Sequence, residues 1–552
     1  MKMYDILYEN LHEDLVTRLL KARWLDYDNS DNHKFLHPTW KDHWIDPFKL
    51  NDLEKGIDRI ILAIKNKEKI MIFGDYDVDG VTSCFILYDF FNKFLWYKNI
   101  SVQLPNRLED GYGMKNYHLD EMKSKWVDLV ITVDNGITSV QEALYAKQIG
   151  LDLIITDHHK NLDIIPDAIA VINPQISPDY DFKGICGAWV AFKFVVGLSK
   201  KLKLNENIRR KIFNRYLPIV AVWTVSDCVP LICENRVMVK KWLDLINKKH
   251  SDVPISLLSM IEYYNIKSDI DSYHIWFMIW PRINAAGRVR SPYEALKSLI
   301  YTGEKQKHHL EEIDNLNTQR KKIQDNMVKM VENDITIDSN IIISCHEEYH
   351  EWVVGIVAGR VTEKYKLPSM ILKIDHARWH GVASLRWPEY FSVIDMLYSA
   401  QDLLERYGWH KQAGWLTVKL EKLDQLISHF EDYCKNNIAP EMLTKPKKVD
   451  TVLYAHEINK DNLIQLDLLK PYGEGNPKPS LLLPGIVIKH KQLIGKDSSW
   501  KHLKLYWNYD DRVIEIVSRG WWKDIWDYDI WNRYDLSLEA RVEADQGIYF
   551  ML

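Results

Sequence analysis

The first third of the chain alternates short apolar runs with segments that have the spacing of amphipathic helices. Apolar runs predict strands at 69–73, 101–104, 127–133, 151–156 and 168–173. Helical spacing predicts helices around and between them, at 53–66, 82–94, 117–123 and 140–148. Strands and helices that alternate in this way form a parallel sheet with helices on both faces, so the pattern predicts an α/β domain.

The remainder of the chain has three further patterns. Residues 304–334 are highly charged with apolar side chains at helical spacing, which predicts a long helix that bridges domains with its charges in solvent. A second α/β segment starts near 341, and a short linker with Lys and Pro follows at 445–448. Alternating apolar and polar residues then predict a small β-barrel from strands at 485–490, 502–507, 512–517 and 536–542.

These patterns predict an α/β protein in which two α/β domains are joined by a long helix and followed by a β-barrel. A chain of 552 residues is also too long for a single core. The boundaries that we expect are an N-terminal segment at 1–50, the first α/β domain at 51–235, a helical connector at 236–335, the second α/β domain at 336–447 and the barrel at 448–552.

Composition narrows the class of protein. The formal charge of -5 argues against a basic coat for nucleic acid but leaves room for a local basic groove. The six cysteines form no CxxC pair, so neither a zinc ribbon nor a disulfide framework is expected. The first residues lack the pattern of a signal peptide, and no apolar run is long enough to span a bilayer. We therefore expect a soluble cytoplasmic protein with no membrane contact.

Acidic and imidazole groups follow three of the predicted strands. They are Asp75, Asp77 and Asp79 in FGDYDVDG, Asp134 in DNG, and Asp157, His158 and His159 in TDHH. In an extended chain the three alternate aspartates of the first motif would point to one side. Open parallel sheets bind ligands beyond the carboxyl ends of their strands, so we expect all these groups to meet at one crevice.

On its own, DxDxDG would also suit a solvated acidic loop or a calcium-binding EF-hand. An EF-hand needs a preceding helix and a closing Glu, but a strand precedes this motif and the closing position falls at Leu87 and its apolar neighbours. Carboxylates with imidazoles and no thiolate instead suit Mn²⁺ or Mg²⁺. Two such ions, about 3.5 to 4 Å apart, can clamp the attacking and leaving oxygens of a phosphoryl group. Asp227 in TVSDCVPL is a further candidate ligand, although a capping or turn Asp would also fit there.

Eight motifs, in order along the chain, resemble the DHH phosphoesterase family, and within it the RecJ-type exonucleases of single-stranded DNA. They are GDYDVDGVTS, VDNGIT, TDHH, ICGAWVAFK, TVSDCVPL, PRINAAGR, GWHKQAGW and PYGEGNPKP. The specificity lies in the series, because DxD with DHH alone also fits pyrophosphatases and oligoribonucleases. The resemblance covers nearly all of the chain beyond the N-terminal segment and implies a DHH domain, a DHHA1 domain, an OB-like barrel and two divalent metal ions, Mn²⁺ or Mg²⁺.

The resemblance also implies roles for these acidic and imidazole groups, with the exception of Asp157. The metal ligands would be Asp75 and Asp77 on the first ion, Asp79, His158 and Asp227 on the second, and Asp134 between both. His159 would meet the scissile phosphate and stabilise developing charge, and His410 would face the metal centre from the DHHA1 domain. Many relatives carry a His where this chain has Phe73, so the shell of the first ion departs from the family pattern.

Several further residues match positions that contact the substrate in this family. Arg107, Ser384 and Arg386 match positions that hold a 5′ phosphate, a role that suits the forked guanidinium of arginine. Further substrate contacts are expected from Arg282 in PRINAAGR and, on the barrel, from Lys496, Lys501, Lys504 and Tyr506. Taken singly, each of these residues would also fit an ordinary surface or core position.

The resemblance implies a metal-dependent exonuclease that hydrolyses single-stranded DNA from 5′ to 3′ into mononucleotides during recombination and repair. It also implies a monomer whose partners are single-stranded DNA, a single-strand-binding protein and a helicase. One alternative is a phosphodiesterase of short oligonucleotides or cyclic dinucleotides, but that activity needs no barrel. Another is a non-catalytic replication scaffold, which would have lost metal ligands that this chain retains.

Tryptophan stands at several positions where the family pattern has glycine. These are Trp189, Trp223, Trp276, Trp280, Trp352, Trp409, Trp415 and Trp500. Glycine permits positive φ and close backbone approach, so the largest side chain is its worst substitute. Our hypothesis is that UGA codons that mean glycine in the source organism have been translated as tryptophan. The alternative is a tryptophan-rich lineage with compensating cavities.

Overall fold

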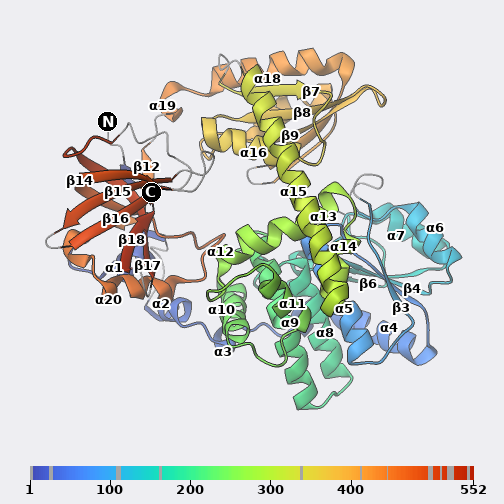
Figure 1. The fold of residues 1–552 in the computed structure, drawn as a ribbon. Helices are drawn as coiled ribbons and strands as arrows, with labels where there is room; N and C mark the ends of the chain where they lie inside the picture. The colour runs from blue at the N-terminus through green and yellow to red at the C-terminus, as the bar shows by residue number, and fades with distance from the viewer. Residues whose placement is uncertain are drawn as a thin grey trace.

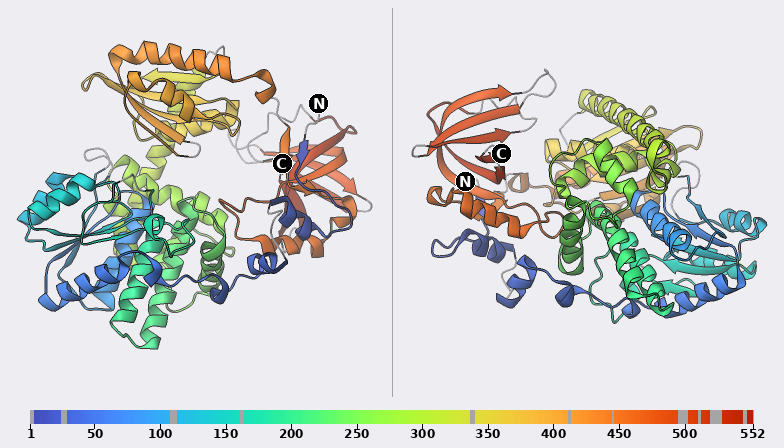
Figure 2. Two further views of the ribbon diagram at one scale, coloured as in Figure 1. Left: turned by 180° about the vertical axis from the view of Figure 1, so that it is seen from behind. Right: turned by 60° about the horizontal axis from the view of Figure 1, so that its bottom comes forward.

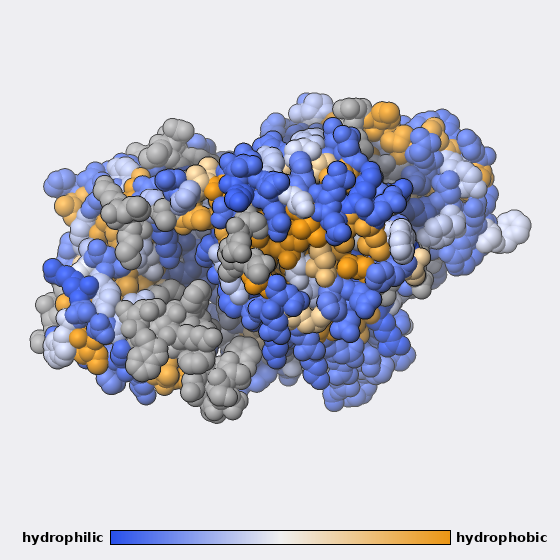
Figure 3. Space-filling model, turned by 90° about the horizontal axis from the view of Figure 1, so that it is seen from above, coloured by the Kyte–Doolittle hydropathy of each residue, from blue (hydrophilic) through white to orange (hydrophobic). Residues whose placement is uncertain are grey.

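The computed structural model describes residues 4–23, 29–106, 113–160, 164–335, 340–410, 413–443, 446–494, 502–509, 512–518, 528–543 and 547–551. These residues form a first lobe with a parallel sheet, a second lobe with a mixed sheet, and a β-barrel (Figure 1). Seen from above, the surface is recessed between the barrel and the other two lobes (Figure 3). No helix within the described ranges is both long and apolar enough to cross a membrane.

The first lobe is built on a five-stranded parallel sheet in the order β3-β2-β4-β5-β6. Its strands are β2 (Ile70–Phe73), β3 (Ile100–Gln103), β4 (Leu129–Val133), β5 (Asp152–Thr156) and β6 (Ala170–Ile172). Its helices are α4 (Leu53–Asn66), α5 (Val78–Lys93), α6 (Asn116–Ser124), α7 (Val140–Gln148) and α8 (Gly187–Lys201). The α/β prediction is confirmed.

Neighbouring residues of β2 divide between the two faces of this sheet. Ile70 and Ile72 join a core that includes α4, α5 and α8, whereas Met71 and Phe73 join a second core with α6 and α7. Helices therefore cover both faces, and the strands are buried on both sides. This explains why they appear in the sequence as continuous apolar runs.

One local expectation is wrong. The helix predicted at 82–94 begins at Val78, because Asp77 caps α5 and accepts hydrogen bonds from the backbone N–H groups of Asp79 and Gly80. Asp79 therefore lies in the first turn of a helix. The three aspartates of the motif do not share one side of an extended segment but turn around the start of α5.

Helices connect the first lobe to the second. They are α9 (Glu206–Ser226), α10 (Cys233–Asn247), α11 (Ile255–Tyr263), α12 (Ser272–His274), a π-helical turn (Ile275–Ile279), α13 (Trp280–Val289), α14 (Tyr293–Ile300) and α15 (Gly303–Asp334). The largest core of the molecule runs from Leu50 to Leu316, so most of these helices pack with the first lobe. The second half of α15 leaves this core and reaches the second lobe (Figure 1).

The second lobe has a five-stranded sheet in the order β10-β11-β9-β8-β7. Its strands are β7 (Ile342–His346), β8 (Ser369–Asp375), β9 (His380–Arg386), β10 (Leu404–His410) and β11 (Ala413–Lys419). Only β7 and β8 pair in parallel. The helices of this lobe are α16 (Val354–Tyr365), α17 (Val393–Ser399), α18 (Leu423–Asn437) and α19 (Pro440–Leu443).

The C-terminal part forms the predicted barrel. The strands β14 (Leu481–Ile494), β15 (His502–Tyr509), β16 (Arg512–Ser518), β18 (Gly547–Met551) and β17 (Arg533–Glu543) pair in that order, and β17 pairs again with β14 to close the ring. The short elements β13 (Thr451–Val452) and α20 (Lys460–Gln465) precede the ring.

The N-terminal segment ties the barrel to the first lobe. Its β1 (Tyr4–Ile6) pairs with β12 (Lys447–Val449), and α1 (Leu15–Arg23) packs in the barrel core. Beyond α2 (Asn29–Leu36) and α3 (Trp40–His43), Trp44 lies 5.9 Å from the ring of Trp189 in the first lobe. Figure 2 shows this blue segment running from the barrel to the first lobe.

Seven of the eight tryptophans at glycine-like positions lie in described parts of the chain, and Trp500 lies outside them. Trp189 and Trp223 are fully buried, and Nε1 of Trp189 donates a hydrogen bond to Glu234 at 3.2 Å. None of the seven described residues has a positive φ. The glycine hypothesis therefore stays a prediction at these positions.

Candidate metal centre

The candidate metal centre lies at the carboxyl ends of β2, β4 and β5. Three groups of side chains bring ligand atoms within 4.8 Å of one another: Asp75, Asp77 and Asp134; Asp79, His158 and Asp227; and Asp134, His158 and His159. Asp134 and His158 each belong to two of the groups, so the ligand atoms form one continuous cluster. The structure therefore brings all six predicted metal ligands together.

Asp134 occupies the middle of the cluster in a strained conformation. Its φ of +61° lies in the left-handed region, where residues with a Cβ are uncommon and where strain often accompanies function. Burial, together with the charges of Asp79 and Asp77, raises the pKa of its carboxyl well above the usual range. An anion in this position is unfavourable unless a cation neutralises it.

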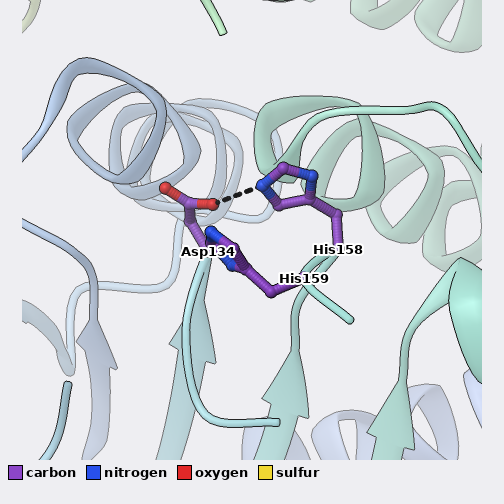
Figure 4. Close-up of side chains that lie close together, drawn as sticks. All are labelled: Asp134, His158 and His159. Carbon is purple, nitrogen blue, oxygen red and sulfur yellow. Dashed lines mark ion pairs between the residues drawn. The ribbon is translucent and has the colours of Figure 1, made fainter. Parts of the chain in front are cut away.

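Nε2 of His158 faces three carboxylates. It lies 3.1 Å from Oδ1 of Asp134, 3.7 Å from Oδ2 of Asp227 and 3.8 Å from Oδ2 of Asp79, and Figure 4 shows the ring aimed at Asp134. Burial lowers the pKa of His158, which favours the neutral imidazole that binds metals. Within the described ranges, neither this Nε2 nor Oδ1 of Asp134 makes a hydrogen bond. Two buried polar atoms left facing each other in this way fit a shared cation.

The N-terminus of α8 supports Asp79. Oδ2 of Asp79 accepts a hydrogen bond from the N–H of Gly187 at 2.5 Å, and Oδ1 accepts one from Ala188 at 2.9 Å. A Cβ at Gly187 would lie only 2.6 Å from Oδ1 of Asp134, so the helix can come this close only with glycine there. Burial and the charge of Asp227 still raise the pKa of Asp79 to about 7.

Asp227 lies at the C-terminal end of α9. Its N–H donates a hydrogen bond to the carbonyl of Trp223 at 2.8 Å, so the residue ends a helix rather than starting one. A helix C-terminus disfavours a carboxylate. Burial and the charge of Asp77 also raise the pKa of Asp227 to about 8. The geometry therefore gives this anion no structural benefit, which favours the ligand interpretation over the capping one.

Asp157 orients the second histidine of the motif. Its buried carboxylate accepts hydrogen bonds from the backbone N–H groups of His158, His159 and Ile137 and lies 2.8 Å from Nδ1 of His159. Burial is the largest influence and alone would lower the pKa of His159, but the hydrogen bond to Asp157 and the charges of Asp157, Asp227 and Asp77 together outweigh it and raise the pKa to about 9. No role is predicted for Asp157 from the sequence, where its only signal is its place before the two histidines.

Phe73 provides no ligand. It is fully buried, and its ring centroid lies 5.1 Å from that of His118. The first group of ligands therefore consists of carboxylates alone, namely Asp75, Asp77 and Asp134.

Two of the residues matched to 5′-phosphate binding lie together on β9. Nη1 of Arg386 donates a hydrogen bond to Oγ of Ser384 at 3.2 Å. Both border the start of α16, because a Cβ on Gly355 would lie 3.0 Å from Oγ of Ser384 and 3.3 Å from Nη2 of Arg386. A half-buried guanidinium beside a hydroxyl and a helix N-terminus suits a phosphate.

Of the other predicted substrate contacts, Arg282 and Lys504 are engaged by other residues of the protein. Arg282 is engaged by Asp314 at 2.7 Å and by the ring of Tyr264, whose centroid lies 4.5 Å from its Cζ. On the barrel, Lys504 pairs with Glu515 at 2.6 Å. His410 ends β10, opposite Ala413. Arg107, Lys496 and Lys501 lie outside the described residues.

Two family models match separate parts of the chain. The DHH family, N-terminal domain, matches residues 69–222, and the RecJ OB domain matches residues 449–544. The single-stranded-DNA-specific exonuclease RecJ of Bacillus subtilis (strain 168) is 32% identical over 521 residues, which cover 93% of this chain and 64% of that protein. The chain thus spans a little under two thirds of that relative's length.

Two solved structures have a similar fold. The crystal structure of RecJ in complex with Mn²⁺ from Thermus thermophilus has a TM-score of 0.78 and 23% identity, over 99% of this chain and 78% of that one. A crystal structure of exonuclease RecJ bound to manganese has a TM-score of 0.60 and 27% identity, over 72% of this chain and 98% of that one. Two parts of the chain therefore match the DHH family and the RecJ OB domain, and the chain is similar to RecJ proteins along nearly all of its length.

Proposed function

We propose that this protein is a metal-dependent exonuclease that hydrolyses single-stranded DNA from 5′ to 3′ into mononucleotides, acting in DNA recombination and repair. The observation that carries the proposal is the cluster of five carboxylates, three of them buried, around the neutral imidazole of His158. Such a cluster destabilises the fold unless divalent cations neutralise it. The Bacillus subtilis relative is named a single-stranded-DNA-specific exonuclease, and a related structure is bound to manganese.

The donor set fits two divalent ions, Mn²⁺ or Mg²⁺. Asp75 and Asp77 would hold one, Asp79, His158 and Asp227 the other, and Asp134 would lie between them. When bound, two such ions supply Lewis acidity that activates water and offsets the charge of the reacting phosphate. The strained Asp134 and the hydrogen bonds from Gly187 and Ala188 hold the carboxylates in place for them.

His159 would act on the scissile phosphate. Its Nδ1 is held by Asp157, and with a pKa of about 9 the ring carries a second proton on Nε2 at neutral pH. A protonated Nε2 can donate a hydrogen bond to a phosphate oxygen as negative charge develops there.

The polarity of degradation would come from the second lobe. Ser384 and Arg386 would hold the 5′ phosphate, with Arg107 as a further contact. The bond to the 3′ oxygen of the terminal nucleotide would then break, and the next nucleotide would keep the phosphate. His410 would complete the site from the second lobe, and the barrel, with Lys496 and Lys501, would hold the strand beyond it.

The proposal includes the setting in which the enzyme works. We expect a cytoplasmic monomer that acts with a single-strand-binding protein and a helicase, because a single-strand-specific nuclease needs another protein to open duplex DNA. Sedimentation of the purified protein tests the monomeric state. Degradation of a duplex with and without an added helicase tests the need for unwinding.

The central test uses long single-stranded DNA labelled separately at each end, with Mn²⁺, and compares the chain with Asp134→Ala. Mononucleotides should appear from the 5′ end first and should disappear with Asp134→Ala. Circular dichroism of both proteins checks that they are folded. Release from the 3′ end first, or equal activity of the variant, would overturn the proposed polarity or the metal centre respectively.

A further inference from the structure

An aromatic pair, one ring half-buried and the other exposed, lies where the first lobe meets the barrel. Tyr273 on α12 and Phe277 on the π-helical turn have ring centroids 4.6 Å apart, and 65% of Phe277 is exposed. Nζ of Lys478, from the segment before the barrel, lies 5.8 Å from the ring of Tyr273. In Figure 1, α12 faces the barrel on the inner side of the first lobe.

The same helical run leads to the metal centre. The π-helical turn continues into α13, and Gly287 near the end of α13 touches the loop between Asp75 and Asp79. A Cβ on Gly287 would lie 2.4 Å from the carbonyl oxygen of Tyr76 in that loop. Ten residues separate Phe277 from Gly287, which is about 15 Å of helix at 1.5 Å per residue. At a stacked spacing of about 3.4 Å, this length corresponds to roughly four or five nucleotides.

The surrounding structure holds the pair firmly in place. Ile275 and Ile279 of the π-helical turn are fully buried in the main core. Nη1 of Arg282 donates a hydrogen bond to the carbonyl of Met278 at 2.6 Å, which secures the π-helical turn. π-helical turns often occur at functional sites. A rigid exposed ring next to a lysine offers a face for a base and a cation for its phosphate.

We propose that Tyr273 and Phe277 form a stacking platform for the bases of a single strand, four or five nucleotides from the metal centre on the way to the barrel. The inference rests on the proposed exonuclease function and assigns a further binding site to it. The surface is recessed between the barrel and the other two lobes (Figure 3), and α12 lies on the side of the first lobe that faces the barrel (Figure 1). Aromatic stacking tolerates any base, as an enzyme that degrades arbitrary sequence requires.

Kinetics on substrates of different length test the platform. Phe277→Ala should raise KM for 20-nucleotide single strands about fivefold to a hundredfold. It should leave kcat on them, and both constants on trinucleotides, unchanged, because a trinucleotide does not reach Phe277. Phe277→Tyr should restore the wild-type KM, whereas Phe277→Leu, which keeps apolar area without a π face, should not. Phe48→Ala, at an exposed ring on another part of the surface, is the matched control.

Each result is decisive. Wild-type activity on trinucleotides but not on longer strands would contradict the proposed exonuclease function itself. An unchanged KM in Phe277→Ala on 20-nucleotide strands, with normal wild-type activity, would overturn the platform alone and assign the pair to another partner. Full rescue by leucine would overturn stacking, and equal losses on short and long substrates would indicate a general structural defect.

A separate observation concerns the backbone of other tryptophans. Four have left-handed φ: Trp96 at +56°, Trp126 at +60°, Trp379 at +61° and Trp531 at +75°. All four side chains are strongly exposed, between 59% and 84%. Glycine is the usual residue in this conformation, and tryptophan gains nothing there from burial. Glycine is also scarce in the chain, at 23 of 552 residues against a usual share of about 7%, whereas there are 21 tryptophans.

Two turns of the first lobe have the same hydrogen bonds, but one has glycine and the other tryptophan at the same position. After α7, the N–H of Gly150 bonds to the carbonyl of Lys147, and the N–H of Leu151 to that of Ala146. After α6, Trp126 and Val127 make the same two bonds, to Lys123 and Met122. Both are Schellman turns, with φ of +65° at Gly150 and +60° at Trp126, and both lead into a strand of the same sheet. Trp126 therefore stands at the glycine position of the turn.

We infer that the natural protein has glycine at Trp96, Trp126, Trp379 and Trp531, encoded by UGA codons that the source organism reads as glycine. UGA at codons 96, 126, 379 and 531, with glycine in the matching peptides of the native protein by mass spectrometry, is the expected result. UGG at these codons would overturn the inference. Trp126→Gly should also raise the unfolding midpoint of the chain, whereas Gly150→Trp should lower it. A lower midpoint in Trp126→Gly, or a higher one in Gly150→Trp, would contradict the equivalence of the two turns.

Discussion

Two clusters of charged side chains in the first lobe differ in their charge balance. Behind the sheet, Lys193 on α8 pairs with Glu234 on α10, and both are fully buried. Glu234 also accepts hydrogen bonds from Tyr180 at 2.6 Å, from Trp189 at 3.2 Å and from the N–H of Ile45 at 2.9 Å. Charge and hydrogen bonds are balanced within the protein itself.

The metal centre has no such balance. The carboxyl groups of Asp79, Asp134 and Asp227 in this centre have raised pKa values, most strongly at Asp134. The comparison teaches that burial alone does not mark a functional site, since both clusters are buried. What marks it is an excess of one charge that the fold brings together without neutralising, because only a ligand of the opposite charge can then complete it.

The largest expected effect is the loss of nuclease activity when a ligand of the metal centre is replaced. Asp134→Asn should reduce nucleotide release from single-stranded DNA at least about a thousandfold, since it removes several kcal/mol of metal-derived stabilisation. In the presence of a chelator, the same variant should unfold at a higher temperature than the original chain, because a like charge is gone. A chelated variant that is less stable than the original would contradict the charge-excess interpretation.

Breaking the balanced cluster should affect stability instead. Glu234→Ala leaves Lys193 buried without its partner and should cost about 3–5 kcal/mol in the free energy of unfolding. Urea denaturation measures the loss, and the exposed pair Lys147–Asp167 is the control, since Asp167→Ala should cost less than about 1 kcal/mol. If Glu234→Ala and Asp167→Ala lower the free energy of unfolding equally, the buried pair of Lys193 and Glu234 does not stabilise the fold more than an exposed pair does.

Divalent ions and pH should both act on the metal centre. The pKa values of Asp79 and Asp227, about 7 and about 8, exceed their values in the unfolded chain, so the folded metal-free protein binds the extra protons. Its stability should therefore be greatest at acidic pH and fall as the pH rises through 7 to 8. Mn²⁺ at a hundred times its Kd should add about 2.7 kcal/mol and remove this fall.

Denaturation curves at pH 5, 7 and 9, with chelator or with Mn²⁺, measure these effects. Asp227→Asn cannot titrate and should show a shallower fall in chelator. A chelated original chain that gains stability between pH 5 and pH 8 would show that the carboxylates are not held at raised pKa values.

A smaller effect is expected from the residue that orients His159. Asp157→Asn keeps the shape of the side chain but weakens its hold on Nδ1, so activity should fall about tenfold to a hundredfold with little change in Mn²⁺ affinity. Measuring kcat from pH 6 to pH 9 tests the role, because the alkaline limb should move to lower pH when the charge of Asp157 is removed. An unchanged profile would reduce Asp157 to a packing residue.

Local sequence patterns predicted the architecture well. Apolar runs and helical spacing placed α4 and α7 to the residue and all five strands of the first sheet to within a few residues. They succeed because burial of a strand on both faces, and of a helix on one, depends on side chains that are adjacent or nearly so in the sequence. The start of α5 was missed because the cap, Asp77, lies inside a motif that suggested an extended chain.

The sequence by itself determined which ligand types this protein has and, through strand order, that they gather at one edge of a parallel sheet. Only the tertiary structure decided how they act. It brought Gly187 against Asp134, placed Asp227 at a helix C-terminus and engaged Arg282 with Asp314. It also paired Lys193 with Glu234 and left the carboxylates of the metal centre with an excess of negative charge. Such outcomes depend on contacts between residues far apart in the chain, where a pKa or a close approach is set by neighbours that no local pattern encodes.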